Sequence, residues 1–159
     1  EGLSIRDLRS VLEGVADAAP RSKDPVFLVE QVRRRLFRQI TSRVADASGT
    51  VRALTFDRGS EDMLRRSLAA SDGEAVLAPD LETARRLVSL LETQAARRAA
   101  EGQPTVVITS PDLRKPLYEF ASRFFSDLFV ITARELVPGT AVEPAGTIDL
   151  GTAALGRAA

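Results

Sequence analysis

The chain has 159 residues, of which 44% are hydrophobic and 28% are charged, a composition typical of a globular protein with a substantial core. Lysine and arginine number 22, as do aspartate and glutamate, so the formal net charge is zero and nucleic-acid binding through bulk charge is disfavoured. Cysteine and histidine are absent, which excludes disulfide bonds, thiol or imidazole catalysis, and zinc sites built on these residues.

The chain carries no signal for membrane insertion or secretion. No apolar run approaches the roughly 20 residues that a membrane-spanning helix needs. The first residues, Glu1 to Ser4, lack the basic and apolar regions of a signal peptide and contain no initiator methionine. Because the sequence opens directly on a helix-start pattern, we expect the chain to be a soluble piece of a longer protein.

Two amphipathic helices are predicted at the N-terminal end. Ser4 opens the first helix, whose apolar residues recur at helical spacing as far as Pro20. Asp24 fits the N-cap of a second helix, which is predicted to run to about Val44. Together these helices predict an αα-hairpin over residues 1–48.

Short strands and helices alternate in the rest of the chain. Each predicted strand is rich in β-branched or continuous apolar residues, and the strands span 50–56, 105–109, 128–131 and 142–148. Helices are predicted to begin at Ser60, Asp80 and Ser110. Unbroken apolar strands indicate a sheet that is buried on both faces and partly parallel.

The sequence therefore predicts a mixed α/β fold in two parts. A helical subdomain over 1–48 precedes a small α/β sandwich with a partly parallel sheet over 49–150. The tail at 151–159 is rich in small residues, and we predict that it is disordered.

The turn from Thr109 to Asp112 is where an α/β fold of this kind would bind an anion. Backbone N–H groups at the start of the following helix would face a phosphate there. Ser110, Pro111 and Asp112 also fit an ordinary helix start, and the carboxylate would repel a phosphate. We favour the ordinary helix start and keep a ligand-binding or enzyme domain that uses this turn as the alternative.

Nucleotide loops and metal sites find little support. The chain has neither a glycine-rich dinucleotide fingerprint nor a Walker A loop. Asp57, Glu61 and Asp62 gather at a strand end and could hold a hard cation, but acidic residues are favoured in any first helical turn. We predict a protein without catalytic residues, cofactor or bound metal.

The densest basic patch consists of Arg33, Arg34, Arg35 and Arg38. It is either a solvated helix face or a contact with another subunit, and it lacks the interleaved aromatic residues that stack single-stranded nucleic acid. Because arginine is enriched at protein interfaces, we predict that Arg33, Arg34 and Arg38 lie on the outer face of the hairpin, near a neighbouring subunit.

Four of the seven phenylalanines lie between residues 120 and 129. Most should be core, but one of the adjacent pair Phe124 and Phe125 should point away from the sheet. We name Phe125 as the candidate for a partner groove, although it could also lie under the C-terminal segment.

Three stretches resemble one known family, the large export-gate proteins of flagellar and virulence type III secretion (FlhA/InvA-like). EGLSIRDL at 1–8, followed by VLE at 11–13, is the most specific. The second is KDPVFL from Lys23, continuing through VR at 32–33 to LFRQI at 36–40, and the third covers 106–117 and 128–136, ending in Glu135-Leu136. The order and spacing fit the family across residues 1 to about 148, and we favour its virulence branch (SctV).

The resemblance implies a transport scaffold without covalent chemistry. The parent protein would have a multi-helix membrane domain in the bacterial inner membrane and a four-part cytoplasmic domain, of which this chain would be the C-terminal end. Family members assemble as a nonameric ring and receive export substrates, chaperones, a gatekeeper and the ATPase stalk. The best-known chaperone-docking surface would lie outside this chain.

Overall fold

The computed structural model, which describes residue 3 and residues 6–71 and 73–151, forms two compact units. The helical unit comprises the chain up to Val51 together with 133–142, and the α/β unit comprises 52–132 and the chain from Glu143 onward. The segment 133–142 was predicted in the α/β part, but it packs with the helices instead. Beyond Gly151, the predicted disordered tail lies outside the described residues.

The helical unit is built on a pair of packed helices, α1 (Leu8–Ala18) and α2 (Pro25–Arg35). α1 is capped by Asp7, whose carboxylate accepts the Ser10 N–H at 3.1 Å. The helix therefore begins later than predicted, and the predicted start at Ser4 lies outside the described residues. Asp24 caps α2 as predicted. The helices approach closely at Gly14, where a Cβ atom would lie 3.2 Å from the Val32 Cα atom.

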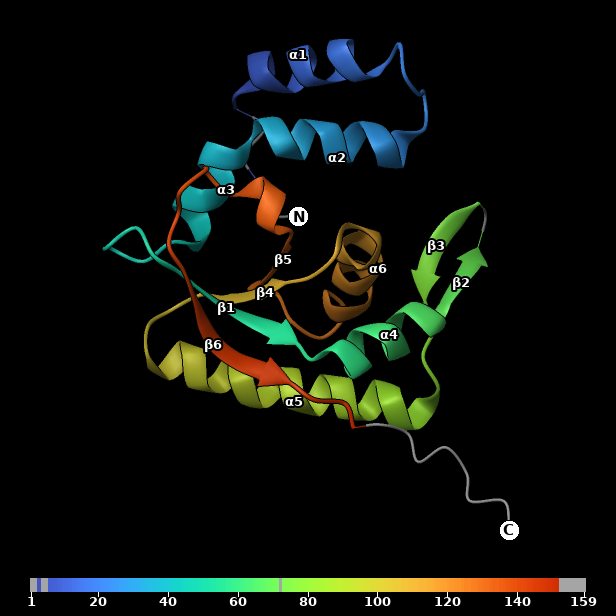
Figure 1. Cartoon of the computed structure of the whole chain (residues 1–159), viewed down its shortest axis with the longest axis vertical. Coiled ribbons are helices and arrows are strands. Elements are labelled where there is room, and N and C mark those ends of the chain that lie inside the picture. Colours follow the sequence, from blue (N-terminus) through green and yellow to red (C-terminus); the bar gives the residue numbers. More distant parts are fainter. Residues whose placement is uncertain (1–2, 4–5, 72, 152–159) are drawn as a thin grey trace. The chain divides into compact units, whose positions relative to one another are not determined.

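The second predicted helix is divided at Leu36, which has φ −83° and ψ 15°. α2 ends at Arg35, and α3 (Phe37–Val44) follows in a new direction (Figure 1). The short 3₁₀ helix η1 (Ala133–Glu135) contacts both helices. It is secured there by a hydrogen bond from the Val137 N–H to the Thr41 hydroxyl at 2.9 Å.

The α/β unit contains a four-stranded sheet in the order β5-β4-β1-β6. Its strands are β1 (Val51–Phe56), β4 (Thr105–Ile108), β5 (Leu128–Ile131) and β6 (Val142–Ile148). β1 pairs with β4, and β4 with β5, in parallel, while β6 runs beside β1 in the same direction (Figure 1). The predicted mixed α/β fold with a partly parallel sheet is confirmed.

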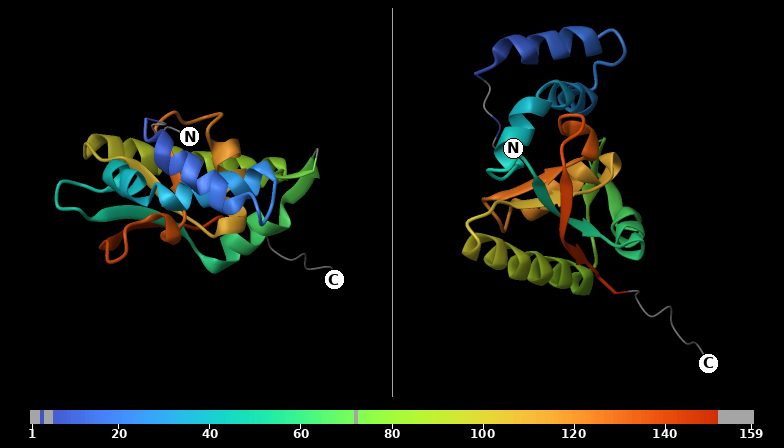
Figure 2. Two further views of the ribbon diagram at one scale, coloured as in Figure 1. Left: turned by 90° about the horizontal axis from the view of Figure 1, so that it is seen from above. Right: turned by 60° about the vertical axis from the view of Figure 1, so that its left-hand side comes forward.

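Helices cover both faces of this sheet. α5 (Leu81–Ala100) runs along one face and α6 (Pro111–Ala121) lies on the other (Figure 1; Figure 2, right). Asp80 caps α5 as predicted, and Gly102, with φ 65°, follows its end. The core between the layers contains fully buried leucines at 54, 64, 87, 91, 113 and 117.

α4 (Arg58–Arg66) is capped by Asp57 and not by the predicted Ser60. The Asp57 carboxylate accepts the N–H groups of Gly59 and Ser60 at 3.0 and 3.3 Å. Ser60 is buried, and its hydroxyl accepts the Leu150 N–H at 2.7 Å, which fixes the end of β6.

A β-hairpin follows α4, in a region where the sequence analysis predicted no strand. Its strands are β2 (Leu68–Ser71) and β3 (Glu74–Leu77), with Gly73 at φ 82° in the turn. Alanine has little strand preference, so the alanine-rich strand gave no signal. The Asp-Gly pair was the available clue, because this dipeptide favours two-residue hairpin turns.

Candidate partner-binding surfaces

Arg33 is not on the outer face of the hairpin, so its prediction as an exposed contact residue was wrong. It precedes Leu36 by three residues and Ile40 by seven, and it therefore shares their buried face. Its Nε donates to Oε1 of Glu135 in η1, and the two side chains are only 7% and 1% exposed. The pair joins α2 to a segment 102 residues away in sequence, which gives Arg33 a structural role.

Arg34 and Arg38 are exposed, as predicted for an outer face. The Arg38 guanidinium lies 5.7 Å from the centre of the Phe37 ring, and neither arginine forms an ion pair within the described part of the chain. Arg35 differs, because it binds Glu13 and Asp17 of α1. The basic patch is therefore reduced to two side chains that are free to meet another molecule.

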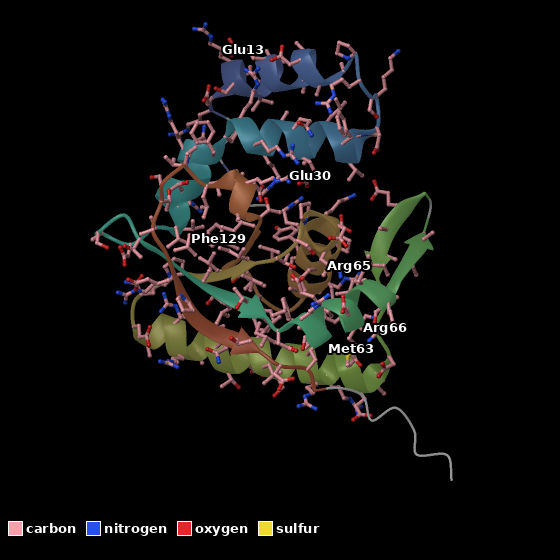
Figure 3. The ribbon with its side chains drawn as sticks, viewed as in Figure 1. Glu13, Glu30, Met63, Arg65, Arg66 and Phe129 are labelled. Atoms are coloured by element: carbon pink, nitrogen blue, oxygen red, sulfur yellow. The ribbon has the colours of Figure 1, made fainter. Side chains whose placement is uncertain are left out.

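The same unit exposes apolar residues on α1. Leu8 and Leu12, one helical turn apart, are 55% and 58% exposed. Figure 3 labels Glu13, the residue that follows Leu12 on α1. Large apolar side chains in a row on one helix face indicate a surface that another protein segment covers.

Phe124, and not the predicted Phe125, is the exposed member of the adjacent pair. Both N–H groups donate to the Ala121 carbonyl just after α6, and this tight turn directs the Phe124 ring outward, leaving it 56% exposed. Phe125 packs against the hydrophobic core. The Phe124 ring stays close to the core ring of Phe120, with 5.6 Å between the centroids.

Phe124 and Phe125 line a pocket of about 340 Å³ in the α/β unit. Its lining includes small residues of α5 and the polar residues Gln103, Ser126 and Asp127. A pocket lined by alanines and aromatic rings can take an apolar side chain of a partner.

The turn from Thr109 to Asp112 is filled by neighbouring side chains. Arg65 donates from Nε to Asp112 at 2.7 Å and from a terminal nitrogen to the Ser110 hydroxyl at 3.2 Å. Partial burial acts to raise the pKa of Asp112, but hydrogen bonds from Arg65 and Ser110 outweigh it and lower this pKa below its ordinary value. Arg65 thus binds the two polar side chains at this helix start. The alternative, that the turn binds a phosphate, therefore finds no support.

The acidic residues near this turn also have ordinary roles. Asp57 caps α4, and Asp62 binds Arg65 at 2.9 Å. In the described ranges, no three acidic side chains gather in a way that could hold a metal ion, and no helix is long and apolar enough to cross a membrane.

Comparison with known proteins identifies relatives over nearly the whole chain. The flagellar biosynthesis protein FlhA of Helicobacter pylori is 31% identical over 152 residues, which cover 94% of this chain and 21% of that protein. The invasion protein InvA of Salmonella typhimurium is 28% identical over 148 residues, or 93% and 22%. The chain thus spans about a fifth of the length of these relatives.

Solved structures share the fold. The nonameric SctV-C of EPEC, solved by cryo-EM, superposes with a TM-score of 0.77 at 25% identity over 92% of this chain and 44% of that one. The Chlamydia pneumoniae CdsV and CdsO complex gives 0.77 at 28% identity over 92% and 43%. The profile of the FHIPEP family matches residues 1–141. The chain therefore belongs to the FHIPEP family, whose export-gate members include FlhA and InvA, and the resemblance drawn from its motifs is confirmed.

Proposed function

We propose that the chain is the C-terminal docking part of the cytoplasmic domain of a type III secretion export gate. It acts by ring assembly and partner binding, without catalysis, on the cytoplasmic side of the bacterial inner membrane. The observation that carries the proposal is the fold likeness over 92% of the chain to a cytoplasmic domain that is nonameric. The match covers 44% of that solved chain, and the role of the whole protein is therefore also proposed.

The helical unit supplies the surface for a neighbouring subunit. Arg34 and Arg38 are exposed, and an arginine fork can bind a carboxylate of the next subunit through two parallel hydrogen bonds. Leu8 and Leu12 add exposed apolar area on the same unit. An interface needs an apolar centre as well as charged residues at its rim, and this unit offers both.

The α/β unit supplies contacts for other proteins of the secretion system. CdsV, a relative with the same fold, forms a complex with CdsO. The pocket beside Phe124 is a surface of this unit that a helical partner could enter with an apolar side chain. Export substrates, chaperones and the gatekeeper are further partners that membership of this family implies.

The test is the double substitution Arg34→Glu and Arg38→Glu in the full-length protein in its native cell. We expect fewer assembled rings and reduced secretion, with a circular dichroism spectrum and thermal melting of the purified chain that match the wild type. Arg85→Glu is the matched control, since Arg85 is an exposed arginine of the α/β unit that does not line the pocket beside Phe124. Normal rings and secretion in the double variant would show that these arginines are only a solvated face.

A further inference from the structure

The β2–β3 hairpin pairs with no further strand in the part of the chain that the structure describes. The two strands form a sheet of their own, in which Ala69 faces Val76 and Ala70 faces Ala75. β3 packs against α6, where Glu74 binds Lys115 at 2.5 Å. β2 is therefore the outer strand of a hairpin that is anchored on its inner side (Figure 1).

The register determines which backbone groups of β2 point outward. The Ala78 N–H donates to the Ser67 carbonyl at 2.9 Å, so these residues occupy a hydrogen-bonded position of the ladder. Hydrogen-bonded and non-hydrogen-bonded positions alternate along an antiparallel pair. Leu68 and Ala70 consequently direct their N–H and C=O groups away from β3, toward the open edge.

This edge lacks the features that normally prevent pairing with another chain. Exposed edge strands usually carry charged residues, proline or a bulge. β2 has the sequence Leu-Ala-Ala-Ser, and its last three residues, 69–71, are exposed. Because their side chains are small, the backbone remains accessible, and this is the geometry that accepts an added strand.

The charge beside the edge indicates what the added strand carries. Arg66 directly precedes Ser67 and β2, is exposed, and has no ion-pair partner among the described residues. Its neighbour Arg65 is occupied by Asp62 and Asp112, and Figure 3 shows both arginines at the end of α4. A strand added antiparallel to β2 would bring its C-terminal side next to Arg66.

We propose that β2 binds an extended segment of a partner protein, added antiparallel to the strand, with an acidic residue near its C-terminal end for Arg66. The backbone groups of Leu68 and Ala70 supply the hydrogen bonds, so the site tolerates many side chains and selects for extended conformation and charge. This site does not depend on ring assembly.

The test uses the ¹⁵N-labelled chain and a capped peptide of alternating threonine and valine that ends in glutamate. We expect saturable NMR shifts at the amides of Leu68 and Ala70, with a dissociation constant of about 1 mM, as suits a few backbone hydrogen bonds. Ala70→Pro removes an outward N–H and leaves the β3 side of the ladder intact, so binding should weaken about five- to tenfold. Ala70→Val, the matched control, keeps the N–H and should bind like the wild type.

Charge is tested separately. Arg66→Gln, or glutamine in place of the peptide glutamate, should weaken binding about two- to fivefold, and the two changes together should weaken it no further. Absence of saturable shifts at about 10 mM peptide, or equal binding by Ala70→Pro, overturns the proposal. The same amides shifting with protein concentration alone would identify a second copy as the occupant and also overturn it. Ala70→Pro cannot be used if it disrupts the hairpin. In that case the test is a peptide whose pairing amides are N-methylated and cannot donate hydrogen bonds to β2. Undiminished binding of that peptide refutes the site.

Discussion

The ion pair between Arg33 and Glu135 should be one of the most sensitive points of the helical unit. Both side chains are nearly inaccessible, so removing one partner leaves a charge that water cannot solvate. Arg33→Met keeps the length and apolar stem of the side chain but removes the charge that pairs with the Glu135 carboxylate. Breaking a buried pair in this way costs about 3–5 kcal/mol.

The expected effect is large against the total stability of the protein. Domains of this size unfold with a free energy of about 5–15 kcal/mol. With a urea dependence of about 2 kcal/mol per molar, the loss should lower the midpoint of unfolding by roughly 1.5–2.5 M. Urea titration followed by far-UV circular dichroism measures it, and Arg34→Met is the control, because an exposed substitution should stay within about 0.5 kcal/mol.

A double variant separates two costs: that of leaving one buried charge without its ion pair, and that of losing the contact itself. Replacing Arg33 and Glu135 together by methionine removes both charges, and such apolar replacements of a buried pair are often close to neutral. We therefore expect the double variant to be more stable than either single variant. A loss below about 1 kcal/mol for Arg33→Met, or simple additivity of the two single losses, would refute the reasoning.

Three further outcomes can be measured on the same chain. Phe124→Ala should cost less than about 1 kcal/mol in urea unfolding and Phe120→Ala about 3–5 kcal/mol, because the first ring is exposed and the second is buried. Gly14→Val should cost about 1–3 kcal/mol and speed amide hydrogen exchange in α1, because even a Cβ atom there would crowd the Val32 backbone. The lowered pKa of Asp112 means that its stabilisation is present above the ordinary aspartate value of 3.8 and is lost as the pH falls below it. Asp112→Asn should therefore reduce the stability difference between pH 6 and pH 3, by at most about 1 kcal/mol for this exposed pair, and an unchanged difference would contradict the assignment.

Local signals allowed most of the elements to be predicted from the sequence. Asp24 and Asp80 cap their helices because a carboxylate before an apolar helical pattern satisfies free N–H groups whatever the surroundings. The apolar strands at 105–108 and 128–131 were likewise predictable, since only burial on both faces accounts for unbroken apolar runs. Local chemistry was sufficient wherever it was not in competition with tertiary contacts.

The candidate site was less predictable because it depends on which direction a side chain faces. Arg33 follows the helical period of Leu36 and Ile40, but an arginine on a buried face is expected only once its counter-charge is known, and Glu135 lies 102 residues away. The outward turn of Phe124 depends on how the chain leaves α6, and the sequence contains no separate signal for that turn.

The position of Arg33 also changes what family membership says about partners. Arg33 belongs to the second family-like stretch and Glu135 to the third, and the structure joins them as one buried pair. These motif residues therefore hold η1 against α2, so the resemblance reports a shared fold at these positions and not a shared binding surface. We therefore propose that partner choice depends on exposed residues that do not belong to this pair. Arg38 is exposed but belongs to the second family-like stretch. Arg34 on the helical unit, and Phe124 and the open edge of β2 on the α/β unit, are exposed positions outside these stretches. They can vary between relatives at little cost to the fold, as the small expected effect of substituting exposed residues implies.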